Sequence, residues 1–162
     1  MDPLKCLAAF CALAVTATAS VAAPTDACAI LTPAEVSAIL GVPVGPGEPM
    51  MPTVRTVCTF NETGSASRWV NAQIIITDAK TFARNKTPVE HVIKAPEPGI
   101  GDEAYWSEYQ QMVPQLYVRK GSAYFMISAR TGSPGSAAAG KNDTEGEKAA
   151  TRKLAAAILK KL

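Results

Sequence analysis

Side chains that could support acid–base or nucleophilic chemistry are scarce in this sequence. His91 is its only histidine, so a hydrolase of the serine type would need it as the general base, with Asp102 or Glu103 to orient it. The chain contains no GxSxG motif, and adjacent residues such as Asp102 and Glu103 point to opposite sides of a strand. We therefore interpret His91 as a solvated residue and the acidic pair as turn-capping, and keep a small hydrolase centred on His91 as the alternative.

The sequence predicts no catalytic residue, no cofactor and no metal site. Gly99 and Gly101 lack the helix-opening context of a nucleotide-binding GxGxxG loop. Histidine, cysteine and acidic residues do not gather at the spacings of a metal centre.

Cys28 and Cys58 offer a different chemistry. They are too far apart for a CxxC redox motif and have no zinc-ligand companions. In an oxidising compartment, two cysteines in a small domain most simply form a disulfide, which we predict; two buried free thiols are the alternative. Closing a loop of about 30 residues would stabilise the fold by about 3.5 kcal/mol in the chain-entropy model.

The aromatic residues favour recognition over catalysis. Tyr105, Trp106 and Tyr109 lie close together in the sequence, and Tyr117 belongs to the next predicted strand. Tyrosine and tryptophan supply rigid contact area with a polar group at interfaces. We predict that these four residues form a recognition surface at the edge 99–109, with core packing as the alternative for each.

Residues 1–23 have the pattern of a secretory signal peptide. Lys5 precedes an apolar, alanine-rich run at 6–15, and small residues follow it. The run is too short to span a membrane, and no later stretch is long enough. We predict a secreted or periplasmic protein that is cleaved between Ala19 and Pro24. Cys6 and Cys11 lack the small residues that precede a lipid-attachment cysteine, and they leave with the leader.

Residues 24–162 have the length of one domain. The 16 basic and 14 acidic residues nearly balance and are scattered, apart from a basic C-terminal end, so no nucleic-acid partner is expected. We expect a monomer without a membrane span.

The clearest local signal is a short helix between Thr32 and Gly41. Thr32 is a typical N-cap, Pro33 suits the first helical position, and Glu35 completes a capping box. Gly41 supplies a left-handed stop. The proline- and glycine-rich connector at 43–52 is predicted to be a surface loop.

The rest of the pattern predicts an α+β fold, in which the N-terminal helix and a C-terminal amphipathic helix pack on an antiparallel sheet of about five strands in two hairpin units. Cys58 shares a strand face with Phe60, which directs it toward the core. The strands are expected at 53–60, 68–77, 104–107, 115–119 and 123–129.

Three further segments complete the prediction. Asp78 begins a short second helix, and 87–93 fits either a third helix or an edge strand. A flexible linker at 130–143 leads to the final helix, for which Thr144 is the expected N-cap and Glu147 its capping-box partner. That helix carries an apolar stripe of Leu154, Ile158 and Leu162.

Four segments together resemble a known group of proteins. They are CAILTPAEV with Leu40-Gly41, Cys58 on a strand, GIGDEAYW at 99–106 and LYVRKG at 116–121. The chain is similar to small exported bacterial proteins and lipoproteins with DUF3558-type domains of unknown function. The resemblance implies an α+β domain with an antiparallel sheet and supplies no activity. Many of those proteins carry a lipidated cysteine near the mature N-terminus, which this chain lacks.

The sequence as a whole predicts a non-enzymatic binding or accessory module that recognises a protein, a peptide or an envelope component. A secreted enzyme inhibitor and the hydrolase centred on His91 are the alternatives.

Overall fold

A computed structural model describes residues 23–64, 69–109, 112–132 and 144–162. Almost all of the predicted leader, and residues 133–143 of the predicted linker, lie outside the described residues. The elements are η1 (Ala27–Ala29), α1 (Pro33–Leu40), β1 (Glu48–Met51), β2 (Val54–Asn61), β3 (Asn71–Thr77), α2 (Ala79–Lys86), β4 (Val92–Pro96), β5 (Glu103–Tyr109), β6 (Gln115–Lys120), β7 (Ala123–Arg130) and α3 (Thr144–Leu159).

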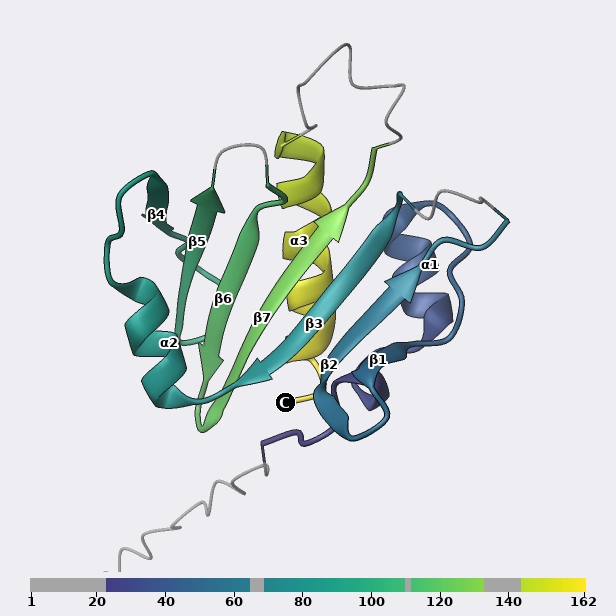
Figure 1. The fold of residues 1–162 in the computed structure, drawn as a ribbon, viewed down its shortest axis with the longest axis horizontal. Coiled ribbons are helices and arrows are strands. Elements are labelled where there is room, and N and C mark those ends of the chain that lie inside the picture. Colours follow the sequence, from purple (N-terminus) through teal and green to yellow (C-terminus); the bar gives the residue numbers. More distant parts are fainter. Residues whose placement is uncertain (1–22, 65–68, 110–111, 133–143) are drawn as a thin grey trace, which may run out of the picture.

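The strands form one antiparallel sheet in the order β1-β2-β3-β7-β6-β5-β4 (Figure 1). The strands from β1 to β3 and from β4 to β7 form two meanders, which meet where β3 pairs with β7. Helix α2 lies in the connection that carries the chain from β3 to the far edge. The α+β class and the antiparallel sheet are therefore confirmed.

The sheet has seven strands, so the prediction of about five was wrong. The connector at 43–52 was predicted as a loop but contains β1, whose Pro49 pairs with Cys58. Proline has no backbone N–H to donate to a ladder, which an edge strand such as β1, with only one neighbour, tolerates. The segment 87–93 leads into β4, which forms the opposite edge. For that segment the structure selects the edge strand from the two predicted alternatives, and both strands beyond the predicted five are short edge strands.

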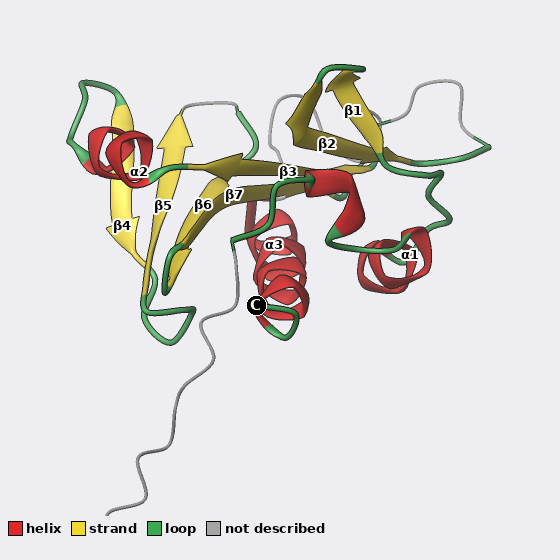
Figure 2. Ribbon diagram, turned by 90° about the horizontal axis from the view of Figure 1, so that it is seen from below, coloured by secondary structure: helices red, strands yellow, loops and turns green. Residues whose placement is uncertain are grey.

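Helices α1 and α3 lie on one face of the sheet, and α2 lies over one end of the other (Figure 2). The main core fills the space between the sheet and α3, where Leu154 and Ile158 are fully buried. Thr151 of α3 accepts a hydrogen bond at its Oγ1 from the backbone N–H of Ala129, at 3.0 Å. Thr144, the expected N-cap of this helix, is its first helical residue.

The ends of α1 are as predicted. The Thr32 hydroxyl accepts a hydrogen bond from the N–H of Glu35, and the Glu35 carboxylate accepts one from the N–H of Thr32 at 2.7 Å. Gly41 ends the helix at φ 74°, in the left-handed region. Lys161, just after α3, donates a hydrogen bond to the Glu35 carboxylate and so joins α1 to the C-terminal end of the chain. The same hydrogen bond lowers the pKa of Glu35 to about 2.

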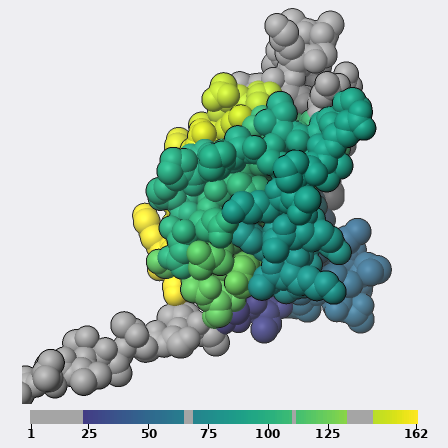
Figure 3. Space-filling view, turned by 90° about the vertical axis from the view of Figure 1, so that its left-hand side faces the viewer, coloured from purple at the N-terminus to yellow at the C-terminus, as the bar shows by residue number. Residues whose placement is uncertain are grey.

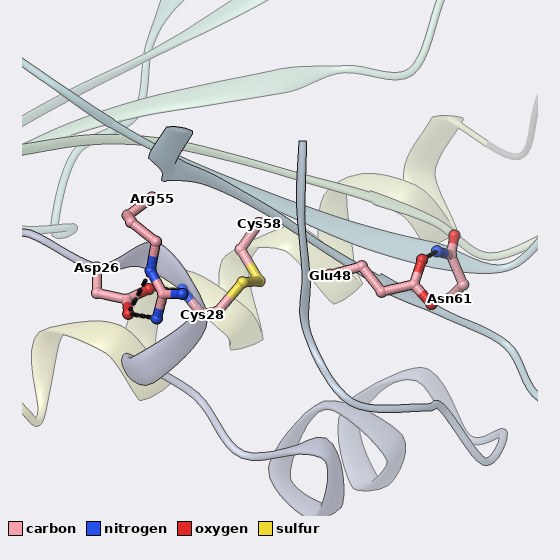
Figure 4. The surroundings of a disulfide bond; sticks show 6 residues. All are labelled: Asp26, Cys28, Glu48, Arg55, Cys58 and Asn61. Carbon is pink, nitrogen blue, oxygen red and sulfur yellow. Dashed lines mark hydrogen bonds and ion pairs between the residues drawn. A yellow bond between two sulfur atoms is a disulfide. The ribbon is translucent and has the colours of Figure 1, made fainter. Parts of the chain in front are cut away.

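The predicted disulfide joins Cys28 of η1 to Cys58 on β2 (Figure 4). The two Cα atoms are 5.1 Å apart, an ordinary separation for a disulfide. Cys58 is fully buried, and a Cβ at Gly47 would lie only 2.6 Å from its sulfur. Beside the bridge, Arg55 forms an ion pair with Asp26. The bridge therefore holds the segment before α1 against the sheet.

Candidate ligand-binding site

The four aromatic residues predicted as a recognition surface do not form one surface. Successive residues of β5 point to opposite faces, so Tyr105 and Trp106 are separated by the sheet. Both are buried, with 3% and 2% of their surface exposed, while Tyr109 is 51% exposed. The prediction of a continuous aromatic surface is corrected: only Tyr109 of these three is accessible to a partner.

Tyr105 and Tyr117 instead attach α2 to the sheet. Their rings stack at 5.0 Å, with Phe82 of α2 edge-on to Tyr105 at the same distance. The Tyr105 hydroxyl donates to the backbone carbonyl of Phe82 at 2.8 Å, and burial raises the pKa of Tyr105 above its ordinary value. This cluster covers one end of the face opposite α3. The segment from α2 to β5 forms the outer surface at that side of the molecule (Figure 3).

Trp106 attaches α3 to the same edge of the sheet from the other side. Its indole N–H donates to Glu97, which also accepts two hydrogen bonds from Arg152 of α3, at 2.9 and 3.1 Å. Arg152 and Lys148 lie over the ring, at 5.3 and 5.5 Å from its centroid. The hydrogen bond from Arg152 lowers the pKa of Glu97, so the carboxylate is ionised where it is held. The role of Trp106 is structural.

The structure does not bring Asp102 to His91, whose exposed ring lies instead 3.3 Å from a carboxylate oxygen of its exposed neighbour Glu90. His91 lies in the turn before β4, at φ 62°, and Val92 pairs with Tyr109 at the end of β5. Asp102 precedes the start of β5, so it lies roughly 20 Å away along that strand. Asp102 accepts a hydrogen bond from the N–H of Gly121 at 2.7 Å, which lowers its pKa and fits the predicted capping role.

No described helix lies over the other half of the face opposite α3 (Figure 1). That half holds a depression of about 270 Å³. Register brings its walls together, because Gln73 pairs with Ser128 and Asn71 with Arg130 across β3 and β7. Gln115 lies beside them at the start of β6, and the preceding segment closes one end. The lining consists of Asn71, Gln73, Met112, Val113, Gln115, Ser128 and Arg130.

Arg130 dominates the electrostatics of this depression. Its guanidinium carbon lies 5.7 Å from the centroid of the Trp69 ring, which is 37% exposed. Among the residues that the structure describes, Arg130 has no acidic partner, and the side chains of Asn71, Gln73 and Ser128 form no hydrogen bonds. Gln115 accepts one from the Tyr117 hydroxyl at 3.2 Å. The site therefore offers one uncompensated cation and several polar groups that a ligand can engage.

Sequence reasoning missed this site. In the sequence, Asn71 and Gln73 belong to the polar side of the strand expected at 68–77, Ser128 belongs to the strand expected at 123–129, and Arg130 follows that strand. These residues share one face of neighbouring strands only because β3 pairs with β7. The two strands are about 50 residues apart in the chain, so the sequence does not show that they are neighbours. A search for polar residues on alternating positions of every strand would have found the candidates but not their grouping.

Within the described ranges, no three His, Cys, Asp or Glu residues are placed to hold a metal ion. None of the helices in those ranges has both the length and the apolar character needed to cross a membrane.

No protein-family model matches this chain, and no curated protein or solved structure matches it either.

Proposed function

We propose that this protein is an exported, monomeric binding module without a catalytic site, which recognises its ligand through the polar depression between β3, β7 and β6. One observation carries the proposal: within the described part of the chain, Arg130 has no acidic partner and lies among the amide and hydroxyl groups of the sheet face. A half-buried cation with no carboxylate beside it can pair with an anionic ligand in the complex.

Two features support a secreted or periplasmic location. The first is the signal-peptide pattern of residues 1–23. The second is the bond between Cys28 and Cys58, because disulfides form and persist in oxidising compartments. An envelope or extracellular ligand is consistent with both.

The test fills the depression without naming the ligand. Ser128→Tyr places a large side chain at its centre, on a strand face that accepts tyrosine well. Ser122→Tyr is the matched control, because Ser122 is exposed in the turn between β6 and β7, at the other end of the sheet.

Each purified protein is immobilised and incubated with the envelope fraction of its own source, and the molecules that it retains are identified by mass spectrometry. We expect the natural protein and Ser122→Tyr to retain the same species and Ser128→Tyr to lose it. Equal retention by Ser128→Tyr, with the fold intact by circular dichroism, would contradict the proposed site.

A further inference from the structure

We propose that the ligand of this depression is an acidic oligosaccharide, whose carboxylate is held by Arg130 and whose hydroxyl groups are read by Asn71, Gln73 and Gln115. This inference rests on the proposed function, because it names the ligand class of the same site.

The charge of the open face favours an anion. On β3, β7, β6 and β5 the only acidic residue that points to this face is Glu103, at the end covered by α2. Glu48 of the edge strand β1 shares the face, two strands away from Gln73, and its carboxylate accepts a hydrogen bond from Asn61 at 3.2 Å. Glu103 is engaged by Lys86 at 2.5 Å and by Arg119 at 3.5 Å. The two cations nearer the open half are Arg130 and Lys94, and no carboxylate on these strands competes with a ligand for them.

The contact with Trp69 prepares Arg130 for a carboxylate. A guanidinium stacked on an aromatic ring keeps its N–H donors at its edge, where a planar carboxylate can accept two parallel hydrogen bonds. Trp69 therefore orients the arginine and also offers its exposed surface to the apolar side of a sugar ring. A lysine at this position would retain the charge but could not form a bidentate pair of hydrogen bonds with the carboxylate.

The position of the depression favours a saccharide over a peptide strand. An extended peptide is commonly bound by adding it to a free sheet edge, whereas β3, β7 and β6 each have a strand neighbour on both sides. Recognition here must use side chains alone. The amide groups of Asn71, Gln73 and Gln115 each carry both donors and an acceptor, which matches hydroxyl groups that also donate and accept.

The polar row continues beyond the depression. Gln73, Ser128, Gln115 and Ser107 occupy successive strands at one register level, and Lys94 follows on β4. Lys94 donates to the Ser107 hydroxyl at 2.6 Å. From β7 to β4 the row spans three strand spacings, or about 14 Å. The depression itself is small for a ligand pocket, so it fits a single sugar unit with the rest of the chain along the row.

The experiment is isothermal titration of the exported protein with tetragalacturonate and with its methyl ester, which has the same sugars without charge. We expect the acid to bind, and the ester to bind at least about tenfold more weakly, because hydrogen bonds to charged groups are the stronger ones. Arg130→Gln should weaken binding of the acid by a similar factor, and Arg130→Lys should restore it only in part. Arg84→Gln, which removes an exposed arginine on α2, is the matched control and should bind as the natural protein does.

Equal affinity for acid and ester, or an unaltered affinity in Arg130→Gln, would overturn the inference. Hexaglutamate supplies the carboxylates without the sugar, and binding of this peptide as tight as that of tetragalacturonate would assign the site to an acidic peptide instead. If tetragalacturonate fails to bind while Ser128→Tyr still abolishes retention of envelope material, only the ligand class is wrong. If Ser128→Tyr changes nothing, the proposed function fails as well.

Discussion

Replacing Cys28 and Cys58 together with alanine is expected to lower the free energy of unfolding by about 3.5 kcal/mol. The bridge closes a loop with a sequence separation of 30 residues, and the chain-entropy model gives that figure for a loop of this length. Because domains of this size are typically stable by roughly 5–15 kcal/mol, the loss is a large share of the total. Without the bridge, the segment before α1, which contains η1, would be held to β2 by its packing and by the ion pair between Asp26 and Arg55.

Urea unfolding followed by circular dichroism measures this change. A reducing agent should destabilise the natural protein by a similar amount and leave the double variant unaffected, which separates loss of the bond from loss of the sulfur atoms. A change below about 1 kcal/mol, or an equal effect of the reductant on both proteins, would show that the bridge contributes little to the folded state.

Trp106→Ala is expected to cost about 3–5 kcal/mol of stability, as large-to-small core substitutions do. Trp106 is 2% exposed, and the substitution also removes the indole donor from Glu97 and the ring beneath Arg152 and Lys148. Glu97 would keep its two hydrogen bonds from Arg152, so the loss is expected mainly from the cavity. Thermal and urea unfolding provide the measurement.

Tyr109→Ala is the control for this prediction, because Tyr109 is exposed three residues further along the same strand. Its stability should remain within about 0.5 kcal/mol of the natural protein. Trp106→Phe keeps most of the buried volume and serves if the alanine variant does not fold. A stable Trp106→Ala protein with weakened ligand binding would reverse the assignment and restore Trp106 to a recognition surface.

Local features of the fold could be predicted from the sequence, because their causes are local. The capping box of Thr32 and Glu35, the stop at Gly41 and the cap of α2 at Asp78 each depend on residues within one helical turn. The disulfide followed from the number of cysteines left after the predicted leader. These features need no knowledge of how the strands pair.

Features that depend on strand pairing could not be predicted. Pro49 argued against a strand at 48–51, but only a central strand excludes proline, and the position of β1 at the edge is a property of the whole sheet. Tyr105 and Trp106 looked like one cluster in sequence, although alternation along β5 places them on opposite faces. Arg130 became a candidate only when the pairing of β7 with β3 placed it beside Asn71.

The two tryptophans allow the most direct test of the binding face, because Trp69 lies beside Arg130 and Trp106 is buried under α3. A ¹⁵N–¹H correlation spectrum resolves one indole N–H signal for each, and Trp69→Phe assigns them. On titration with tetragalacturonate we expect the Trp69 signal and the amides of residues 71, 73, 115, 128 and 130 to shift while the Trp106 signal stays in place. Shifts confined to Trp106 or to the β4 edge, with Trp69 unmoved, would contradict recognition through the open face of the sheet.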